Sequence, residues 1–245
     1  MTNVYFVRHG QAGTREAYDS LSGLGRRQAR LLGEYLVSQR VDFAAAYAGN
    51  LTRQRQTAAE VAAAYADAGL AFPELTPDAG WDEFDFHHIY KELAPLLCAE
   101  DEEFRREYEE ISEQVRASAG AHDAEVHRRW RPSDTKVVEA WAGGRYPYGG
   151  ETWEQFVARV SACRLRGDGG GGPGPRADVA VFTSATPTAV WTGLALGIRD
   201  GRVRRLAAVL ENTAYTVIQL RADEMLLLTF NAVPHLNEPS LRTRR

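Results

Sequence analysis

The sequence predicts an α/β protein: a three-layer α/β/α sandwich built on a mostly parallel, doubly wound sheet with an antiparallel edge. Three observations support this prediction. Short apolar runs rich in β-branched and aromatic side chains recur along the chain, as expected of strands buried on both faces. Stretches with helical apolar spacing alternate with these runs, and this order implies parallel pairing through right-handed crossovers. Two late runs flank Arg221-Ala222-Asp223-Glu224, which predicts a hairpin at an antiparallel edge.

The individual elements are assigned from periodicity and from their flanking residues. Ser22 precedes the first helical stretch and is a candidate N-cap, and Gly69 ends the second, alanine-rich one. Strands are expected at residues 4–7, 41–48, 178–184, 213–220 and 225–230, and helices at residues 24–39, 51–68, 151–165 and 187–196.

No sequence feature marks a domain boundary, so residues 1–245 are predicted to form a single domain. A charged helical insertion is expected at about 87–148, because dense mixed charge there is typical of one or two solvated helices. The glycine-rich stretch 167–175 lacks the Lys-Ser/Thr pair of a P-loop and is interpreted as a flexible connector. The basic tail, residues 242–245, is expected to be disordered.

Composition limits the possible partners and the compartment. The formal net charge of -4 argues against a general nucleic-acid binder. The two cysteines, Cys98 and Cys163, provide neither a disulfide framework nor zinc-site spacing, which suits a reducing compartment. No apolar run approaches the ~18 residues of a membrane helix, and Arg8 and His9 interrupt any signal-peptide core. The prediction is a cytoplasmic protein with no membrane partner.

The first candidate site lies at the end of the first predicted strand. Val4 to Val7 is followed directly by Arg8-His9-Gly10: a cation, a nucleophile or base, and a residue that lets the backbone turn. Because ligands of open α/β sheets bind beyond the carboxyl ends of the strands, this position favours function. The alternative is a strand that simply ends in polar residues.

Two other segments contain groups that could act with this pair. Arg53 lies in the first turn of a predicted helix, where the helix dipole disfavours a cation unless it reinforces an anion site. Glu83 and Asp85 lie beside Trp81 and Phe84, and partial burial there could suit a carboxyl group to general acid catalysis. Two arginines, one histidine and one carboxylate form a coherent set for phosphoryl transfer, in which arginines bind phosphoryl oxygens and histidine attacks phosphorus.

The order of these motifs resembles that of the histidine phosphatase superfamily, in its phosphoglycerate mutase-like branch. Each motif is weak alone, and their shared order over nearly the whole chain gives the resemblance its strength. The segments that carry the resemblance are Val7 to Gly10, Leu51 to Ala58 and Trp81 to Asp85. Further segments that match the family are residues 21–29, 149–153, 210–213 and 230–236.

The resemblance implies a phosphomonoesterase that needs no metal and no cofactor and acts on a small phosphorylated substrate or anion. It implies that His9 is the nucleophile that becomes a phosphohistidine. Arg8 and Arg53 would bind the phosphoryl group, and Glu83 would be the general acid that later activates water. Asp85 is the second candidate for the role of Glu83.

One departure from the family pattern concerns the phosphoryl site. The family usually has a second histidine after the late strand, and Ala185 stands at that position. Loss of one hydrogen-bond donor to a developing oxyanion typically lowers the rate roughly 10²–10³-fold. The hydroxyl groups of Ser184 and Thr186, and the N–H groups that open the next helix, could compensate in part.

Several alternatives follow from this departure. The protein could be a catalytically weak relative that binds a phosphorylated or other anionic ligand, whereas a mutase is disfavoured by a weakened phosphoryl site. His87 or His88 could replace the missing histidine, although surface histidines are the simpler interpretation. Gln11 is expected at the mouth of the pocket. Homodimer formation is left as an open alternative, because nothing in the sequence indicates the oligomeric state. The identity of the substrate is equally open.

Overall fold

The computed structural model describes residues 1–13, 19–117, 132–163, 177–199, 201–222 and 224–244. The chain divides into two compact units. The sheet unit comprises residues 1–13, 17–83 and 160–244, and the helical unit consists chiefly of residues 84–159. The predicted connector at 167–175 lies outside the described residues.

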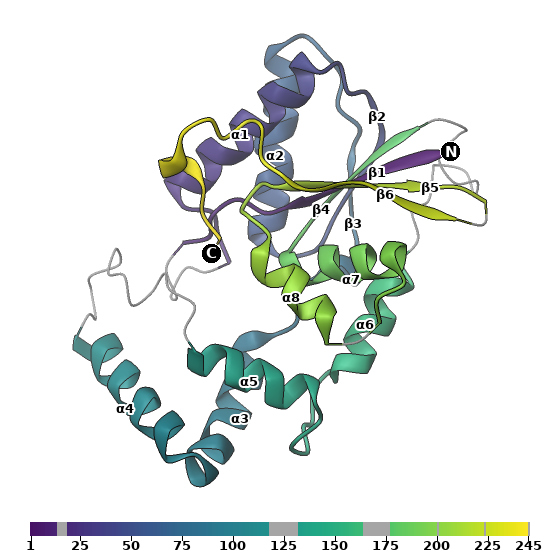
Figure 1. The fold of residues 1–245 in the computed structure, drawn as a ribbon. Helices are drawn as coiled ribbons and strands as arrows, with labels where there is room; N and C mark the ends of the chain where they lie inside the picture. Colours follow the sequence, from purple (N-terminus) through teal and green to yellow (C-terminus); the bar gives the residue numbers. More distant parts are fainter. Residues whose placement is uncertain (14–18, 118–131, 164–176, 200, 223, 245) are drawn as a thin grey trace. The chain divides into compact units, whose positions relative to one another are not determined.

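The sheet unit is built on a mixed sheet (Figure 1). Within the described residues it has six strands in the order β3-β2-β4-β1-β5-β6. Strand β1 pairs in parallel with β4 and antiparallel with β5, so the prediction of a mostly parallel sheet with an antiparallel edge is confirmed. The strands are β1 Thr2–Arg8, β2 Phe43–Ala48, β3 Leu75–Pro77, β4 Asp178–Thr183, β5 Tyr215–Leu220 and β6 Met225–Ala232.

Alternating side chains of β1 face two different layers of helices. Val7 packs in a cluster with Leu32 of α1 (Gly23–Ser38) and Val61 of α2 (Thr52–Asp67). Phe6 faces the other way, and its ring lies 5.3 Å from that of Trp191 in α7 (Ala185–Leu196). Helix α8 (Arg202–Val209) packs against α7. Val4, Phe6 and Val7 are fully buried, so side chains on both faces of β1 are covered and its apolar run is explained.

Local sequence signals explain where the first two helices lie. Ser22 is the N-cap of α1, as predicted, and its hydroxyl oxygen accepts a hydrogen bond from the Gly25 N–H at 3.0 Å. Helices α1 and α2 approach closely at Gly33, where an added Cβ would come within 2.6 Å of the Ala64 Cβ. Gly33 is therefore required by packing between helices rather than by a turn.

The helical unit contains the charged segment. Its helices are α3 (Phe86–Glu100), α4 (Glu102–Ala117), α5 (Pro132–Ala142) and most of α6 (Trp153–Ser161). Helix α4 is not solvated all round, because Phe104 and Ile111 are buried. The ring of Trp141 packs against that of Phe84 at 4.8 Å, so this unit has an aromatic core of its own. No described helix is long and apolar enough to cross a membrane.

The expectation of disorder in the basic tail is wrong for residues 242–244. Leu241 is buried just before them. The main-chain carbonyl of Thr243 accepts a hydrogen bond from the Asn212 N–H at 2.7 Å. The charge of the arginines suggested a solvated segment, but backbone atoms of the tail form hydrogen bonds to the rest of the fold.

The close approach at Gly33 gives a test of helix packing. Gly33→Ala is expected to lower the free energy of unfolding by about 1–3 kcal/mol, because the new methyl group forces α1 and α2 apart. Gly23→Ala is the matched control, since nothing lies within 4 Å of an added Cβ there. Urea unfolding at pH 7.5 measures both. Equal midpoints for the two variants would contradict this account of the packing.

Candidate active site

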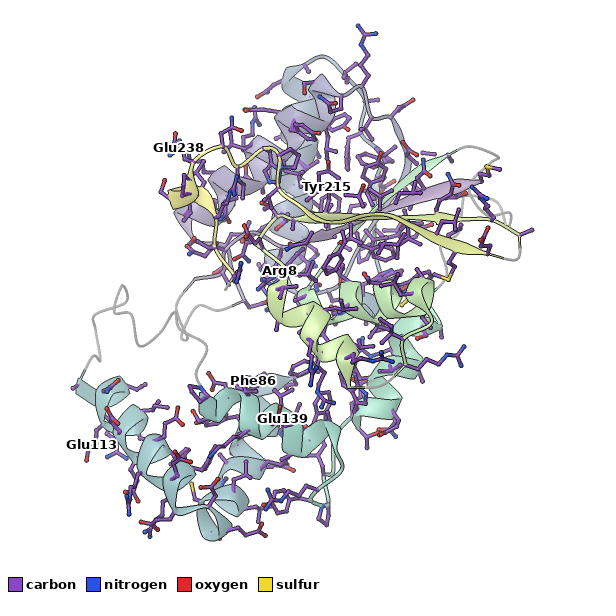
Figure 2. All side chains as sticks on the ribbon, viewed as in Figure 1. Arg8, Phe86, Glu113, Glu139, Tyr215 and Glu238 are labelled. Atoms are coloured by element: carbon purple, nitrogen blue, oxygen red, sulfur yellow. The ribbon has the colours of Figure 1, made fainter. Side chains whose placement is uncertain are left out.

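The candidate nucleophile lies where two neighbouring parallel strands end. Arg8 is the last residue of β1, is paired in register with Thr183 at the end of β4, and is labelled in Figure 2. The His9 N–H donates to the Thr183 carbonyl at 2.9 Å. Arg8 and His9 are 7% and 2% exposed. A cation and an imidazole of such low exposure need specific partners.

Main-chain contacts fix the turn that contains His9. The Asn212 side-chain amide donates to the His9 carbonyl at 3.1 Å. The Thr213 N–H lies 3.1 Å from the Arg8 carbonyl, and Thr213 has a φ of 57°. A β-branched residue in this region is strained, and such strain persists only where surrounding contacts overdetermine the backbone. The Gly10 N–H donates to the Thr57 hydroxyl at 3.0 Å, which joins the turn to α2.

The hydrogen bonds of His9 define its tautomer. Nδ1 lies 2.8 Å from the Gly10 carbonyl oxygen, which can only accept, so Nδ1 bears the proton. Nε2 is then unprotonated and accepts from the Nε–H of Arg53 at 3.3 Å. Burial, followed by the charges of Arg53 and Arg8, lowers the pKa of His9 well below its ordinary value. The imidazole is therefore neutral at pH 7, with its lone pair on Nε2.

Arg53 has a second partner that sequence reasoning missed. Its Nη1 contacts the Asp19 carboxylate at 3.2 Å, and the same Asp19 oxygen accepts from the Thr52 N–H at 3.0 Å. Asp19 thus satisfies a donor at the start of α2 and orients the guanidinium. No local pattern singles out Asp19, because it follows a polar loop more than 30 residues before its partner.

Arg8 is oriented by main-chain atoms. Its Nη2 donates to the Arg244 carbonyl at 2.7 Å, and its Nη1 donates to the Leu210 carbonyl. Two carbonyls on different atoms of one planar group fix its orientation.

The acid segment is tied to the starts of two helices. Oδ1 of Asp82 accepts from the Asn50 N–H at 2.6 Å, just before α2. Oε2 of Glu83 accepts from the Thr186 N–H at 3.1 Å, in the first turn of α7. The structure therefore brings the predicted acid into contact with the segment that contains Ser184, Ala185 and Thr186.

Gln54 connects the acid segment to Ser184. This fully buried amide donates to the Ser184 hydroxyl at 2.9 Å and to the Trp81 carbonyl at 3.2 Å. Gly49 makes room for it, since an added Cβ there would meet the Gln54 Oε1 at 2.0 Å. Sequence reasoning missed Gln54. The one sequence signal for it is Gly49 directly after β2, because a larger residue there would clash with the Gln54 side chain.

The other predicted site residues have local roles. The Gln11 side chain accepts from the Ser22 hydroxyl at 2.8 Å, so it is tied to the start of α1. In the helical unit, Asp85 caps α3 by accepting from the His88 N–H at 3.0 Å. The His88 ring lies 3.2 Å from Glu92, and His87 is exposed.

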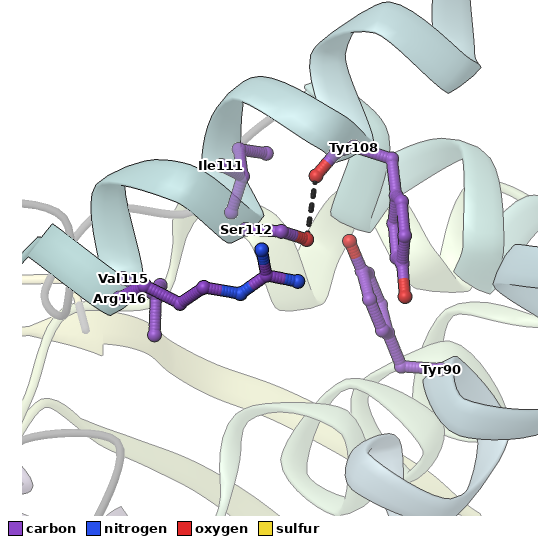
Figure 3. A pocket seen from close by; sticks show the side chains of 6 residues that line it. All are labelled: Tyr90, Tyr108, Ile111, Ser112, Val115 and Arg116. Atoms are coloured by element: carbon purple, nitrogen blue, oxygen red, sulfur yellow. Dashed lines mark hydrogen bonds between the residues drawn. The ribbon is translucent and has the colours of Figure 1, made fainter.

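Two further features are relevant to ligand binding. Among the described residues, no group of three or more His, Cys, Asp or Glu side chains could hold a metal ion. The helical unit has an open cavity of about 280 Å³, where the rings of Tyr90 and Tyr108 stack beside Arg116 (Figure 3). This cavity contains none of the predicted catalytic side chains.

Comparison with known proteins identifies the family of the chain. The sequence model of the histidine phosphatase superfamily, branch 1, matches residues 4–146 and 120–233. The chain belongs to this superfamily. A search of curated protein sequences gave no significant match.

Solved structures of phosphatases share the fold. An alpha-ribazole phosphatase from Shigella flexneri has a TM-score of 0.56 at 14% identity, covering 94% of this chain and 96% of its own. A phosphoserine phosphatase from Entamoeba histolytica gives 0.55 at 16% identity, with 96% and 100% covered. A mycobacterial glucosyl-3-phosphoglycerate phosphatase gives 0.53 at 18% identity, with 94% and 98% covered. At these identities the likeness shows the fold.

Buried histidines make stability depend on pH. Nε2 of His235 lies 2.9 Å from the hydroxyl group of Thr213, the residue whose N–H contacts the Arg8 carbonyl. Burial lowers the pKa of His235 from 6.5 to about 4. Since the unfolded chain binds the proton more readily, the stabilisation present above pH 6.5 is lost as the pH falls toward 4. His235→Gln should reduce the pH-dependent loss in the free energy of unfolding by up to about 3 kcal/mol.

Urea unfolding at pH 7.5, 6, 5 and 4 measures this effect. His87→Gln, at an exposed position of the helical unit, is the control and is expected to leave the pH dependence unchanged. Parallel stability curves for the wild type and His235→Gln would show that His235 does not titrate as stated.

Proposed function

We propose that the protein is a metal-independent phosphomonoesterase that works through a phosphohistidine on His9. The observation that supports this most strongly is the state of His9. It is buried and neutral, with the proton on Nδ1 and the lone pair of Nε2 facing the Arg53 guanidinium. A neutral imidazole with one nitrogen fixed as a donor is the form in which histidine is nucleophilic.

The first half of the reaction transfers the phosphoryl group to the enzyme. Nε2 of His9 attacks phosphorus, the N–P bond forms, and the bond from phosphorus to the ester oxygen breaks. Arg8 and Arg53 neutralise the phosphoryl oxygens, and the Arg53 Nε–H turns from the histidine lone pair to one of these oxygens. Glu83 donates its proton to the departing alcohol.

The second half regenerates the enzyme. The Glu83 carboxylate takes a proton from water, the water oxygen attacks phosphorus, and the N–P bond breaks to release inorganic phosphate and neutral His9. Ser184 and the N–H groups at the start of α7 are proposed as further donors to the phosphoryl oxygens, since the Thr186 N–H of this segment contacts Glu83. The substrate is proposed to be a small phosphorylated molecule, the class to which the substrates named for the structural relatives belong.

A second candidate function is supported by Ala185 alone. A site with one donor fewer would bind a phosphorylated or other anionic ligand and turn it over slowly or not at all.

Cytoplasmic location, absence of nucleic-acid binding and homodimer formation stay predictions.

Replacement of the nucleophile tests the proposed chemistry. His9→Ala is expected to lower kcat for a generic aryl phosphate by more than about 10³-fold, since no other group supplies the attacking nitrogen. The control is Gln39→Ala, at an exposed position at the end of α1. Brief incubation with a 32P-labelled phosphomonoester and an acid-free quench should label the wild type but not His9→Ala. Equal kcat values for His9→Ala and the wild type would contradict the proposed mechanism.

Restoring the absent donor separates the two candidate functions. If the rest of the site is competent, Ala185→His is expected to raise kcat by about 10–10²-fold, because an imidazole N–H adds a donor to the phosphoryl oxygens. Ala185→Leu adds bulk without a donor and should not raise it. If both variants leave kcat at the level of His9→Ala while inorganic phosphate still binds by calorimetry, the ligand-binding function is favoured.

A further inference from the structure

The tail segment, residues 241–244, contacts the same residues that hold Arg8 and His9. Leu241 ends a 3₁₀ turn, Pro239–Leu241, and its buried side chain anchors the segment. The three residues that follow return along the start of α1 and the turn after α8. Figure 1 shows this yellow segment running back beside α1.

Gln28 of α1 is the first connection. This side chain is fully buried, and its Nε2 donates to the Leu241 carbonyl at 2.7 Å and to the Thr243 hydroxyl at 2.9 Å. Its Oε1 accepts from the Gln11 N–H at 2.9 Å. One amide therefore joins the tail segment to the residue two positions after His9.

Thr243 is the second connection, and its hydroxyl group has a defined polarity. The oxygen accepts from Gln28, so its single proton is available to the Asn212 Oδ1 at 2.9 Å. The Thr243 carbonyl also accepts from the Asn212 N–H at 2.7 Å. Because Oδ1 of Asn212 faces Thr243, its Nδ2 faces the His9 carbonyl and donates to it at 3.1 Å.

Arg244 is the third connection. Its carbonyl accepts from Nη2 of Arg8 at 2.7 Å, on the opposite terminal nitrogen from the Leu210 carbonyl. The Arg244 side chain is itself exposed, with a 3.7 Å contact to Glu211. The contact to Arg8 is therefore made by the backbone and depends on where the segment lies.

We propose that Thr243 and the tail segment are positioning elements for catalysis: Thr243 orients Asn212 on the His9 carbonyl, and the Arg244 carbonyl orients the Arg8 guanidinium. The activity readouts rest on the proposed phosphatase function. A merely structural segment would contribute to folding stability and leave the chemistry of the folded enzyme unchanged.

The first experiment removes one hydroxyl. Thr243→Val keeps the shape and leaves Gln28 and Asn212 unmatched, and it is expected to lower kcat/KM for an aryl phosphate about tenfold. Thr243→Ser keeps the hydroxyl and should stay within about twofold of the wild type. Ser240→Ala, at an exposed position of the preceding turn, is the control. A loss of thermal stability in Thr243→Val without a change in kcat or KM would overturn the proposal.

The second experiment ends the chain after Arg242, which removes the carbonyl that Arg8 contacts. Inhibition by inorganic phosphate is expected to weaken about tenfold, because a misoriented guanidinium loses one bond to the anion. Activity that rises on truncation would instead show an autoinhibitory contact and would also overturn the proposal.

A third readout does not need turnover. NMR titration of the His9 ring in the folded protein reports its pKa, which the Arg8 charge helps to lower. Thr243→Val and the truncated chain should each raise this pKa toward 6.5, with Thr243→Ser unchanged. If the wild type hydrolyses no phosphomonoester, the phosphatase function fails and this titration still decides the positioning role. An unshifted His9 in both variants would refute it.

Discussion

The hydrogen bond between the His9 Nδ1–H and the Gly10 carbonyl is the interaction on which the rest of the site depends. It selects the tautomer, and burial together with two guanidinium groups keeps that tautomer neutral. If the ring were protonated, Nε2 would repel Arg53 instead of accepting from it. The two arginines that are proposed to bind an anion therefore also keep the proposed nucleophile neutral, because their charges disfavour the imidazolium form.

The sheet explains why this arrangement forms at this position. β1 lies inside the sheet, between its parallel partner β4 and its antiparallel partner β5, so the residues after β1 meet segments from both sides. Thr183 comes from the β4 side and binds the backbone of His9, and Thr213 comes from the β5 side and binds the backbone of Arg8 and His9. The change of direction at β1 thus opens the space in which ligands of α/β folds bind.

Local sequence was sufficient to predict most strands and the Ser22 cap, because apolar runs and capping residues act locally. It also marked Arg8, His9 and Arg53 as candidates, because each follows a strand or opens a helix, and their catalytic roles stay predictions. It was not sufficient for partners that meet only through tertiary structure. Gln54 and Thr243 occur in segments whose periodicity is unremarkable, and their roles come from hydrogen bonds to residues 27 to 215 positions away. The tail was misjudged for the same physical reason: its charge described the side chains, whereas its backbone makes the contacts.

The segment around Ala185 is tied to the rest of the site by several contacts. The adjacent Ser184 hydroxyl is bound by Gln54, which also binds the carbonyl of Trp81, two residues before the proposed acid. Gly49 supplies the space for that amide. Glu83 then meets the start of α7 through the Thr186 N–H. A buried amide, a glycine and a helix N-terminus thus converge on the segment 184–186 and on Glu83 beside it. A donor added at position 185 would therefore reach the phosphoryl oxygens next to a proposed acid that is already held in place.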